Sequence, residues 1–202
     1  LWTTLISGYV NHGHNEDALT CLKLMQLEHI SPNVATYLSC LKACGNIGAI
    51  ERGQEIHAEI ARKGLLERDH LLVGNALIHM YVKYGQFAIA RKVFDDLACR
   101  DVVSWTTLIS GFVEHGDGKE AIKYFDWMQQ SGFSPDAATT VIVLKSCGSI
   151  GDPQKGGVLH AEIGRLGFVE NNLFVGSALI DMYAKCGALS KAQEVFEEVP
   201  SQ

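Results

Sequence analysis

The chain has 202 residues, 47% of them hydrophobic, and a mean hydropathy of +0.07, so it can bury a substantial core and is not intrinsically disordered. No apolar stretch reaches the roughly 18 residues that a membrane span requires, and we expect no membrane association. The formal net charge is −6. A protein that holds nucleic acid mainly through phosphate contacts carries clustered Lys and Arg instead.

The chain repeats itself at an offset of 103 residues. LWTTLISGYV at 1–10 meets SWTTLISGFV at 104–113, and the HAEI string at 57–60 recurs at 160–163. After a one-residue deletion, VGNALIHMYVKYG at 73–85 meets VGSALIDMYAKCG at 175–187. The sequence is therefore one long unit written twice.

Each long unit divides again, because an ALI or TLI core, a glycine-containing turn and an amphipathic run recur about every 30 to 40 residues. This is the period of helical-hairpin repeats, whose hairpins must stack on their neighbours to bury their apolar faces. We place the repeats at 1–33, 34–70, 71–101, 102–136, 137–172 and 173–202, with the first and last truncated.

Repeat 102–136 shows the expected elements most clearly. We predict a first helix from about Trp105 to Glu114, a stop at Gly116-Asp117-Gly118, and a second helix from Lys119 to about Gln130. Both helices carry apolar residues at helical spacing, which are Leu108, Ile109, Phe112 and Val113 on the first and Ala121, Ile122, Phe125 and Met128 on the second.

The six cysteines lie far apart within helical patterns, and only Cys44 and Cys147 occupy equivalent places in the two halves. This distribution favours reduced, buried thiols over a disulfide framework.

Three segments resemble the repeats of the plant organellar pentatricopeptide family. VVSWTTLISGFVEHGDGKEAIKYFDWMQQSGFSPD (102–136) resembles its P-type motif, LSCLKACGNIGAIERGQEIHAEIARKG (38–64) its L-type motif, and LFVGSALIDMYAKCGALSKAQEVFEEVP (173–200) its shorter S-type motif. The resemblance covers the whole chain and indicates the subclass with alternating P, L and S repeats. One departure, Gly156-Gly157, is expected to loosen the second helix of the fifth repeat.

The resemblance implies an all-α fold, a right-handed superhelical solenoid of antiparallel helix-turn-helix hairpins that forms one domain over residues 1–202. In such a solenoid the first helices line the concave surface and each repeat reads one RNA base with two or three side chains. The main reading positions are the fifth and the last residue of a repeat.

The chemistry of these two positions predicts a base preference. A terminal Asp offers only acceptors, which suits the imino N–H of uracil and guanine, whereas a terminal Asn can also donate to the bare ring nitrogen of adenine or cytosine. A short Thr or Ser at the fifth position leaves room for a purine, and a longer Asn suits a pyrimidine.

Carried over residue by residue, the resemblance assigns Thr3 and Asn33 to adenine, Asn75 and Asp101 to uracil, Thr106 and Asp136 to guanine, and Ser177 to a purine. Leu38 and Val141 occupy the fifth position of the L repeats and cannot hydrogen-bond a base, so these repeats are expected to be spacers. The expected target is A-x-U-G-x-purine, read from the RNA 5′ end. For the fifth-position residues Thr3, Asn75, Thr106 and Ser177 the alternative is that small polar residues only cap or solvate the first turn of a helix.

Two further groups are candidates for RNA contact. Leu72, Val103 and Phe174, at the second position of their repeats, have the bulk to wedge between bases, with core packing as the alternative. Four lysines recur on predicted first helices and are candidates for phosphate contact, with a solvated helix face as the alternative: Lys42, Lys83, Lys145 and Lys185.

The triplets His57-Ala58-Glu59 and His160-Ala161-Glu162 superficially resemble the H-x-E of zinc deaminases, but the P-C-x-x-C partner is absent. We expect them to serve packing and surface roles. No phosphate loop, nucleophile elbow or paired-carboxylate motif occurs, so we predict no catalysis, cofactor or metal in this segment, although a deaminase-like domain could follow it.

These observations predict an RNA-binding specificity module of a chloroplast or mitochondrial RNA-processing factor, with cytidine-to-uridine editing as the expected process. The alternative is a scaffold that docks editing accessory proteins through its L repeats, which the negative charge favours. Because the chain opens at Leu1-Trp2 inside a recurring motif, we expect a fragment whose targeting peptide lies outside it. Its uncapped apolar ends could drive self-association.

Overall fold

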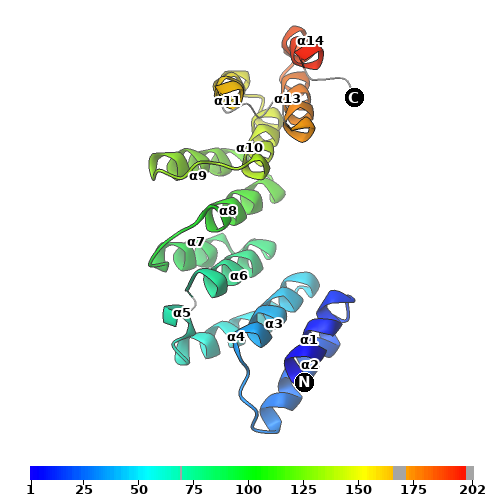
Figure 1. The fold of residues 1–202 in the computed structure, drawn as a ribbon, viewed down its shortest axis with the longest axis vertical. Coiled ribbons are helices and arrows are strands. Elements are labelled where there is room, and N and C mark those ends of the chain that lie inside the picture. The colour runs from blue at the N-terminus through cyan, green and yellow to red at the C-terminus, as the bar shows by residue number, and fades with distance from the viewer. Residues whose placement is uncertain (69, 166–171, 199–202) are drawn as a thin grey trace. The chain divides into compact units, whose positions relative to one another are not determined.

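The computed structural model describes residues 1–68, 70–165 and 172–198, and every regular element in these ranges is an α-helix. The chain divides into two compact units, Leu1–Thr107 and Leu108–Gln202. Figure 1 shows the helices of each unit as successive antiparallel hairpins. The predicted all-α helical-repeat architecture is therefore present in both.

The first unit contains three hairpins and the start of a fourth. Its helices are α1 (Trp2–Asn11), α2 (Asn15–Leu27), α3 (Val34–Ile47), α4 (Ile50–Arg62), the short α5 (Leu65–Arg68), α6 (His70–Lys83), α7 (Phe87–Asp96) and the first half of α8 (Val102–Glu114). The first helices of the hairpins stack, because α3 contacts both α1 and α6. Each first helix also packs against its own second helix, α1 on α2, α3 on α4 and α6 on α7.

The second unit repeats this arrangement. It holds the rest of α8, then α9 (Gly118–Gln130), α10 (Ala137–Ile150), α11 (Pro153–Arg165), α13 (Leu173–Lys185) and α14 (Leu189–Glu198). Here α10 contacts α13, and each pairs with the helix that follows it, α11 and α14. Residues 166–171 of the fifth repeat and 199–202 of the sixth lie outside the described residues.

Several turns between helices contain a glycine in a left-handed conformation. Gly116, for example, has φ of +80°, a left-handed conformation that residues with a side chain rarely adopt. Helix α8 begins at Val102 rather than near Trp105, because Asp101 accepts a hydrogen bond from the Ser104 amide and so starts the helix earlier. Helix α9 begins at Gly118, one residue before the predicted start.

The core of each unit lies between stacked helices and is built from the apolar positions of the repeats. In the first unit the largest buried side chains include Tyr37, Leu41, Leu77, Phe94 and Trp105. In the second they include Phe112, Phe125 and Tyr183. The rings of Phe94 and Trp105 meet edge to face with centroids 4.6 Å apart, a geometry that aromatic pairs favour.

Gly156 tightens the fifth repeat rather than loosening it. Helix α11 runs unbroken from Pro153 to Arg165, and Gly156 is buried against the sulfur of Met182 so closely that a Cβ would overlap it. Gly53 makes the same approach to Met80 in the first unit. The expectation of a loosened helix was wrong because these glycines allow one helix to approach the next.

All six cysteines are free, and four of them, Cys21, Cys40, Cys44 and Cys147, are buried as predicted. Burial raises the pKa of Cys40 to about 12 and of Cys44 to about 11, which makes these thiols poor nucleophiles. The expectation of burial was wrong for Cys99, which is exposed in the segment after α7.

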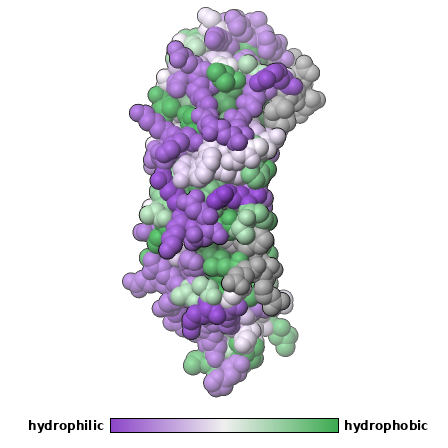
Figure 2. All heavy atoms as spheres, turned by 90° about the vertical axis from the view of Figure 1, so that its left-hand side faces the viewer, coloured by the Kyte–Doolittle hydropathy of each residue, from purple (hydrophilic) through white to green (hydrophobic). Residues whose placement is uncertain are grey.

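The surface shown in Figure 2 is largely hydrophilic, with separate apolar patches. On α14 the acidic side chains Glu194, Glu197 and Glu198 are exposed. Within the described helices, acidic residues are more frequent on second helices than on first helices. Among the described residues no helix combines the length and apolar content needed to cross a membrane.

Replacing Trp105 with alanine should lower the free energy of unfolding by about 3 to 5 kcal/mol, because the side chain is only 1% exposed and packs on Phe94. Trp127→Ala is the matched control, since Trp127 is 41% exposed and its loss should cost less than about 1 kcal/mol. Urea titrations followed by far-UV circular dichroism measure both. Equal losses in the two variants would contradict the packing described for Trp105.

Candidate nucleic-acid interface

The last residue of repeats one, three and four is the N-cap of the next first helix. Asn33 accepts a hydrogen bond from the Thr36 amide (2.9 Å), Asp101 from the Ser104 amide (2.8 Å), and Asp136 from the Thr139 amide (2.7 Å). In each case the oxygen that accepts is Oδ1. The sequence pattern assigned these terminal side chains to base reading alone, and the structure shows that they also cap helices.

Capping uses one polar atom of each terminal side chain, Oδ1, and leaves the second polar atom for another partner. Asn33 keeps its Nδ2 amide donor, and Asp136 keeps the acceptor Oδ2, with no hydrogen bond to either atom from the described residues. Asn33 and Asp136 are exposed, and Asp101 is half-buried. A capped Asn therefore presents a donor to solvent and a capped Asp presents an acceptor, so capping and reading are compatible.

The fifth and last residues of the first repeat are linked through a third side chain. Thr36 Oγ1 donates to Asn33 Oδ1 (2.9 Å) and lies 2.9 Å from Thr3 Oγ1. A hydroxyl has one hydrogen, and Thr36 uses it on Asn33, so Thr3 is the donor in the Thr3–Thr36 bond. Thr3 is left with lone pairs that can accept.

In the third repeat the link between the fifth and last residues is direct. Asn75 Nδ2 donates to Asp101 Oδ1 at 3.3 Å, and the same oxygen accepts from the Ser104 hydroxyl at 2.6 Å. Burial by itself raises the pKa of Asp101, but the hydrogen bonds from Ser104 and Asn75 outweigh burial and hold that pKa below its usual value. Asp101 is therefore an ionised, acceptor-only group at neutral pH.

The remaining base-reading candidates are Thr106 and Ser177. Thr106 is half-buried on α8 in the first unit, and Ser177 is exposed in the first half of α13 in the second. The structure brings together the pairs Thr3 with Asn33 and Asn75 with Asp101. In the L repeats, the fifth-position residues Leu38 and Val141 are half-buried.

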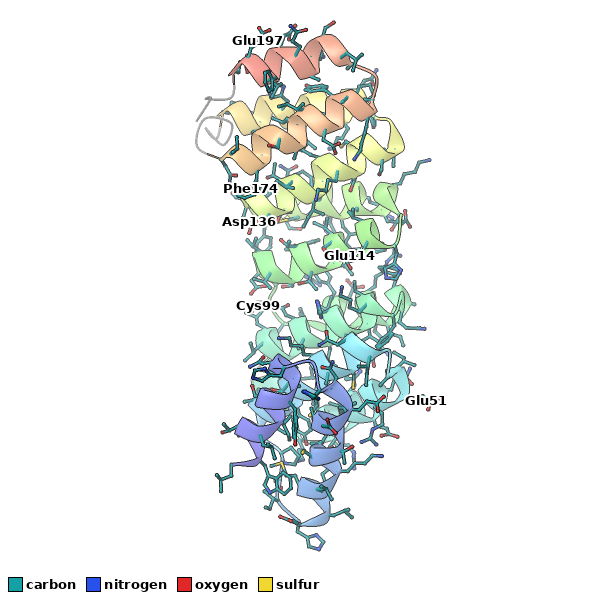
Figure 3. The ribbon with its side chains drawn as sticks, turned by 90° about the vertical axis from the view of Figure 1, so that its right-hand side faces the viewer. Glu51, Cys99, Glu114, Asp136, Phe174 and Glu197 are labelled. Atoms are coloured by element: carbon teal, nitrogen blue, oxygen red, sulfur yellow. The ribbon has the colours of Figure 1, made fainter. Side chains whose placement is uncertain are left out.

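The second-position residues are not core residues. Leu72 and Val103 are each 57% exposed and Phe174 is 81% exposed, which is unusual for side chains of this size. Figure 3 shows Phe174 and Asp136 at the same edge of the second unit, at the beginnings of α13 and α10. Glu114, at the end of α8, lies at the opposite edge of that unit. The core-packing alternative for these three residues is wrong.

The four candidate lysines are all exposed on first helices, but they differ in their surroundings. Lys185 pairs with Asp181 one turn earlier on α13, with Nζ and Oδ2 2.7 Å apart. Phosphate binding by Lys185 would have to compete with that ion pair. Lys42 on α3 and Lys145 on α10 make no hydrogen bond or ion pair within the described ranges.

Both H-A-E triplets connect hairpins. His57 Nδ1 and Tyr81 Oη share a hydrogen bond of 2.9 Å, and Gln26 Nε2 donates to Glu59 Oε2 at 2.8 Å. The second unit repeats these bonds, between His160 and Tyr183 at 3.1 Å and between Gln129 and Glu162 at 2.6 Å. The histidine thus ties its hairpin to the next one and the glutamate ties it to the previous one, which agrees with the predicted packing role.

Sequence reasoning missed the hydroxyl residues Thr36, Ser104 and Thr139, which lie three residues after the terminal Asn or Asp. All three are fully buried, and each donates from its hydroxyl to the capping Oδ1. The sequence did carry a signal for them, because aligning the repeats places Thr, Ser and Thr three residues after the ends of repeats one, three and four.

Stacked antiparallel hairpins with capped first helices define a helical-repeat protein, and sequence comparison identifies which kind. The model of the PPR repeat family matches residues 1–46 and 100–149, and the model of the PPR repeat matches residues 75–102 and 177–202. The chain belongs to the pentatricopeptide repeat family. Both models describe repeats rather than a catalytic domain.

The relatives agree with the predicted location in a chloroplast or mitochondrion. A chloroplastic pentatricopeptide repeat-containing protein of Arabidopsis thaliana is 36% identical over 100% of this chain and 32% of its own length. A mitochondrial one from the same plant is 35% identical over 98% of this chain and 29% of its own length. The chain thus spans about a third of the curated relatives it matches.

The fold is also that of solved pentatricopeptide proteins. The crystal structure of PPR10 from maize superposes with a TM-score of 0.56 and 21% identity, covering 99% of this chain and 34% of that one. PPR10 in complex with an 18-nt psaJ RNA element gives a TM-score of 0.53 and 17% identity, covering 98% of this chain and 34% of that one. The predicted solenoid fold class is confirmed.

Asp136→Ala should destabilise the protein by about 1 kcal/mol, because the amide and hydroxyl of Thr139 lose their acceptor. Asp136→Asn keeps Oδ1 and should stay within a few tenths of a kcal/mol of the unchanged protein. Urea midpoints for the two variants test this difference. If alanine and asparagine behaved alike, capping would not be what holds this side chain.

The lowered pKa of Asp101 predicts a contribution to stability that is present above its unfolded-state pKa of about 4 and is lost as the pH falls through the folded-state value. Between pH 6 and about pH 3 the unchanged protein should therefore lose more stability than Asp101→Asn, which has no proton to take up. Unfolding free energies of both proteins across this range are the measurement. Parallel pH profiles would show that Asp101 is not held by these hydrogen bonds.

Proposed function

We propose that this chain binds single-stranded RNA with sequence selectivity, reading one base per P or S repeat in the order A-x-U-G-x-purine. The observation that carries the proposal is the linkage of fifth and last residues within a repeat, through Thr36 in repeat one and directly between Asn75 and Asp101 in repeat three. In repeat one the linkage leaves a donor on Asn33 and an acceptor on Thr3. The RNA complex of PPR10, a protein of the same family, supports RNA as the ligand.

The first repeat presents the pattern that adenine requires. Asn33 Nδ2 is a donor for the adenine N1 acceptor, and the lone pairs of Thr3 Oγ1 can accept from the adenine N6 amino group. Guanine presents an imino donor and a carbonyl acceptor at the corresponding atoms. The donor of Asn33 and the acceptor of Thr3 therefore complement the hydrogen-bonding edge of adenine, whereas guanine would place a donor against a donor and an acceptor against an acceptor.

The third and fourth repeats present an acceptor instead. Asp101 and Asp136 each bind helix amides through Oδ1, so Oδ2 can accept the imino N–H of uracil or guanine. In repeat three the Asn75 amide, which reaches Asp101, narrows the space and favours the smaller uracil. The short Thr106 favours guanine in repeat four.

The exposed apolar residues and the charge fit this mode of binding. Leu72, Val103 and Phe174 stand in solvent at the second position of the reading repeats and can lie against the faces of successive bases. The net charge of −6 predicts modest affinity that weakens further with added salt, since few phosphates are neutralised. Selectivity would then rest on base edges more than on the backbone.

The biological context that follows is an organellar RNA-processing factor of the alternating P, L and S subclass, with cytidine-to-uridine editing as its process. This segment would supply target recognition, and any chemistry would come from another domain or partner. The names of the chloroplastic and mitochondrial relatives support the organellar part.

A second candidate function is docking of editing accessory proteins through the L repeats. In the first unit a cavity of about 560 Å³ adjoins the L repeat's second helix. It is lined by His57 of α4, Leu66 of α5, and residues of α7 and the segment after it, Ile89, Lys92, Val93, Asp96, Leu97 and Ala98. This mostly apolar site could take an apolar side chain of a partner.

Exchanging Asp136 for Asn should move the preference at the fourth base from guanine toward adenine by about tenfold, because the atom left by the cap changes from acceptor to donor. A gel-shift assay at low salt with an A-x-U-G-x-purine oligonucleotide and its fourth-base variants measures this. Asp117→Asn is the matched control, since Asp117 also caps a helix but lies at the start of the second helix α9. The control should leave base preference unchanged.

If Asp136→Asn failed to shift the preference, the reading assignment would be wrong. If the chain bound none of these RNAs at low salt but did bind an accessory protein, docking would be its function instead.

A further inference from the structure

A buried hydroxyl follows repeats one, three and four, the three repeats whose last residue is assigned to base reading, and is missing after the spacer repeats. Thr36, Ser104 and Thr139 lie three residues after Asn33, Asp101 and Asp136. After the two L repeats the corresponding residues are Val73 and Val175, which are equally buried. The residue at this position is therefore buried after every one of these repeats, but it carries a hydroxyl only after the repeats assigned to base reading.

The hydroxyls touch the reading side chains and cannot touch RNA. Their donor-to-Oδ1 distances are 2.9 Å for Thr36, 2.6 Å for Ser104 and 2.7 Å for Thr139, and all three residues are 0% exposed. The junction after the second L repeat is built differently, because Asn172 accepts from the Phe174 amide at 3.1 Å and faces no hydroxyl three residues on.

Capping alone does not require these hydroxyls. The backbone amide of the same residue already donates to Oδ1 in all three cases, which satisfies the helix start. The added hydroxyl bond supplies a second donor to the same Oδ1 and further restrains the orientation of the terminal side chain. It also uses the hydroxyl's own hydrogen, which in repeat one forces Thr3 to donate inward and keeps its lone pairs for the ligand.

We infer that Thr36, Ser104 and Thr139 are positioning residues that orient the base-reading groups, and that Thr36 also sets the hydrogen-bond polarity of Thr3 and Asn33. In repeat one, hydrogens run from Thr3 to Thr36 to Asn33, leaving an outward acceptor on Thr3 and an outward donor on Asn33. In repeats three and four the hydroxyl holds Oδ1 of the aspartate so that Oδ2 faces the base. This inference rests on the proposed RNA-reading function and assigns a role to residues outside the reading positions.

The test uses Thr36→Val, which keeps the shape of the buried side chain and removes the hydroxyl. Without it, Thr3 can turn its hydrogen outward toward the O6 of guanine, and the Asn33 amide is held by one bond fewer. The ratio of affinities for oligonucleotides with adenine or guanine at the first base should fall about three- to tenfold. Thr36→Ser should restore the ratio of the unchanged protein, because serine supplies the same hydroxyl.

Thr20→Val is the matched control, since Thr20 is exposed on α2 and its hydroxyl bonds only to the Glu16 carbonyl, at 2.9 Å. It should leave the ratio unchanged. Ser104→Ala provides a second arm at another repeat, where the preference for uracil over cytosine at the third base should fall. Circular dichroism of each variant establishes that it is folded, so Ser104→Ala still decides the matter if Thr36→Val does not fold.

The outcomes separate this inference from the proposed function. If the unchanged protein binds RNA and Asp136→Asn shifts its preference, yet Thr36→Val and Ser104→Ala alter affinity for all RNAs equally, the hydroxyls only stabilise the fold and the inference is overturned. If the unchanged protein binds no RNA, the proposed function fails first. A change in base ratio without a matching loss of stability supports the inference.

Discussion

The start of each first helix must have its backbone amides satisfied, and in the reading repeats the side chain that does this is the one assigned to the base. Asn33, Asp101 and Asp136 each give Oδ1 to a helix amide. Because one atom of the side chain is committed to the helix, the other is turned toward solvent in a known chemical state. In the proposed function, a requirement of local folding thereby determines which polar atom of the side chain is left for the base.

In the proposed function this constraint joins the fold to the recognition surface. At the ends of repeats one, three and four the capping residue is the one that we propose as the final reading position, so the next first helix would start where a base is read. Stacking of α1, α3 and α6 in the first unit, and of α10 and α13 in the second, repeats this geometry within each unit. The H-A-E triplets reinforce the stacking by joining each L hairpin to the hairpins on both sides of it.

Much of the fold could be predicted from the sequence, because the internal repeat and the helical spacing of apolar residues are strong signals. The helices of repeat 102–136 were located to within three residues, and the burial of Leu108, Ile109 and Phe112 follows from their spacing. The role of Gly156 was misjudged because a close helix approach depends on Met182, which belongs to another hairpin. The exposure of Cys99 likewise depends on the segment after α7, which has no helical period to indicate it.

For the site, the sequence identified positions but not their hydrogen bonds. It could not show that Thr36 links Thr3 to Asn33, because that link joins helices of adjacent hairpins. It also gave no indication that the terminal residues Asn33, Asp101 and Asp136 cap helices, whereas in the structure one oxygen of each caps and the other polar atom is left over. The exposure of Phe174 could not be decided from its position in the repeat, since a second-position side chain can face either the core or solvent.

The most direct test is a crystal structure of this chain bound to an A-x-U-G-x-purine oligonucleotide. We predict Asn33 Nδ2 within hydrogen-bonding distance of adenine N1, and Oδ2 of Asp101 and Asp136 on the imino groups of uracil and guanine, with every Oδ1 still bound to its helix amide. Bases held elsewhere on the molecule, or terminal side chains that must leave their caps to reach RNA, would contradict the account.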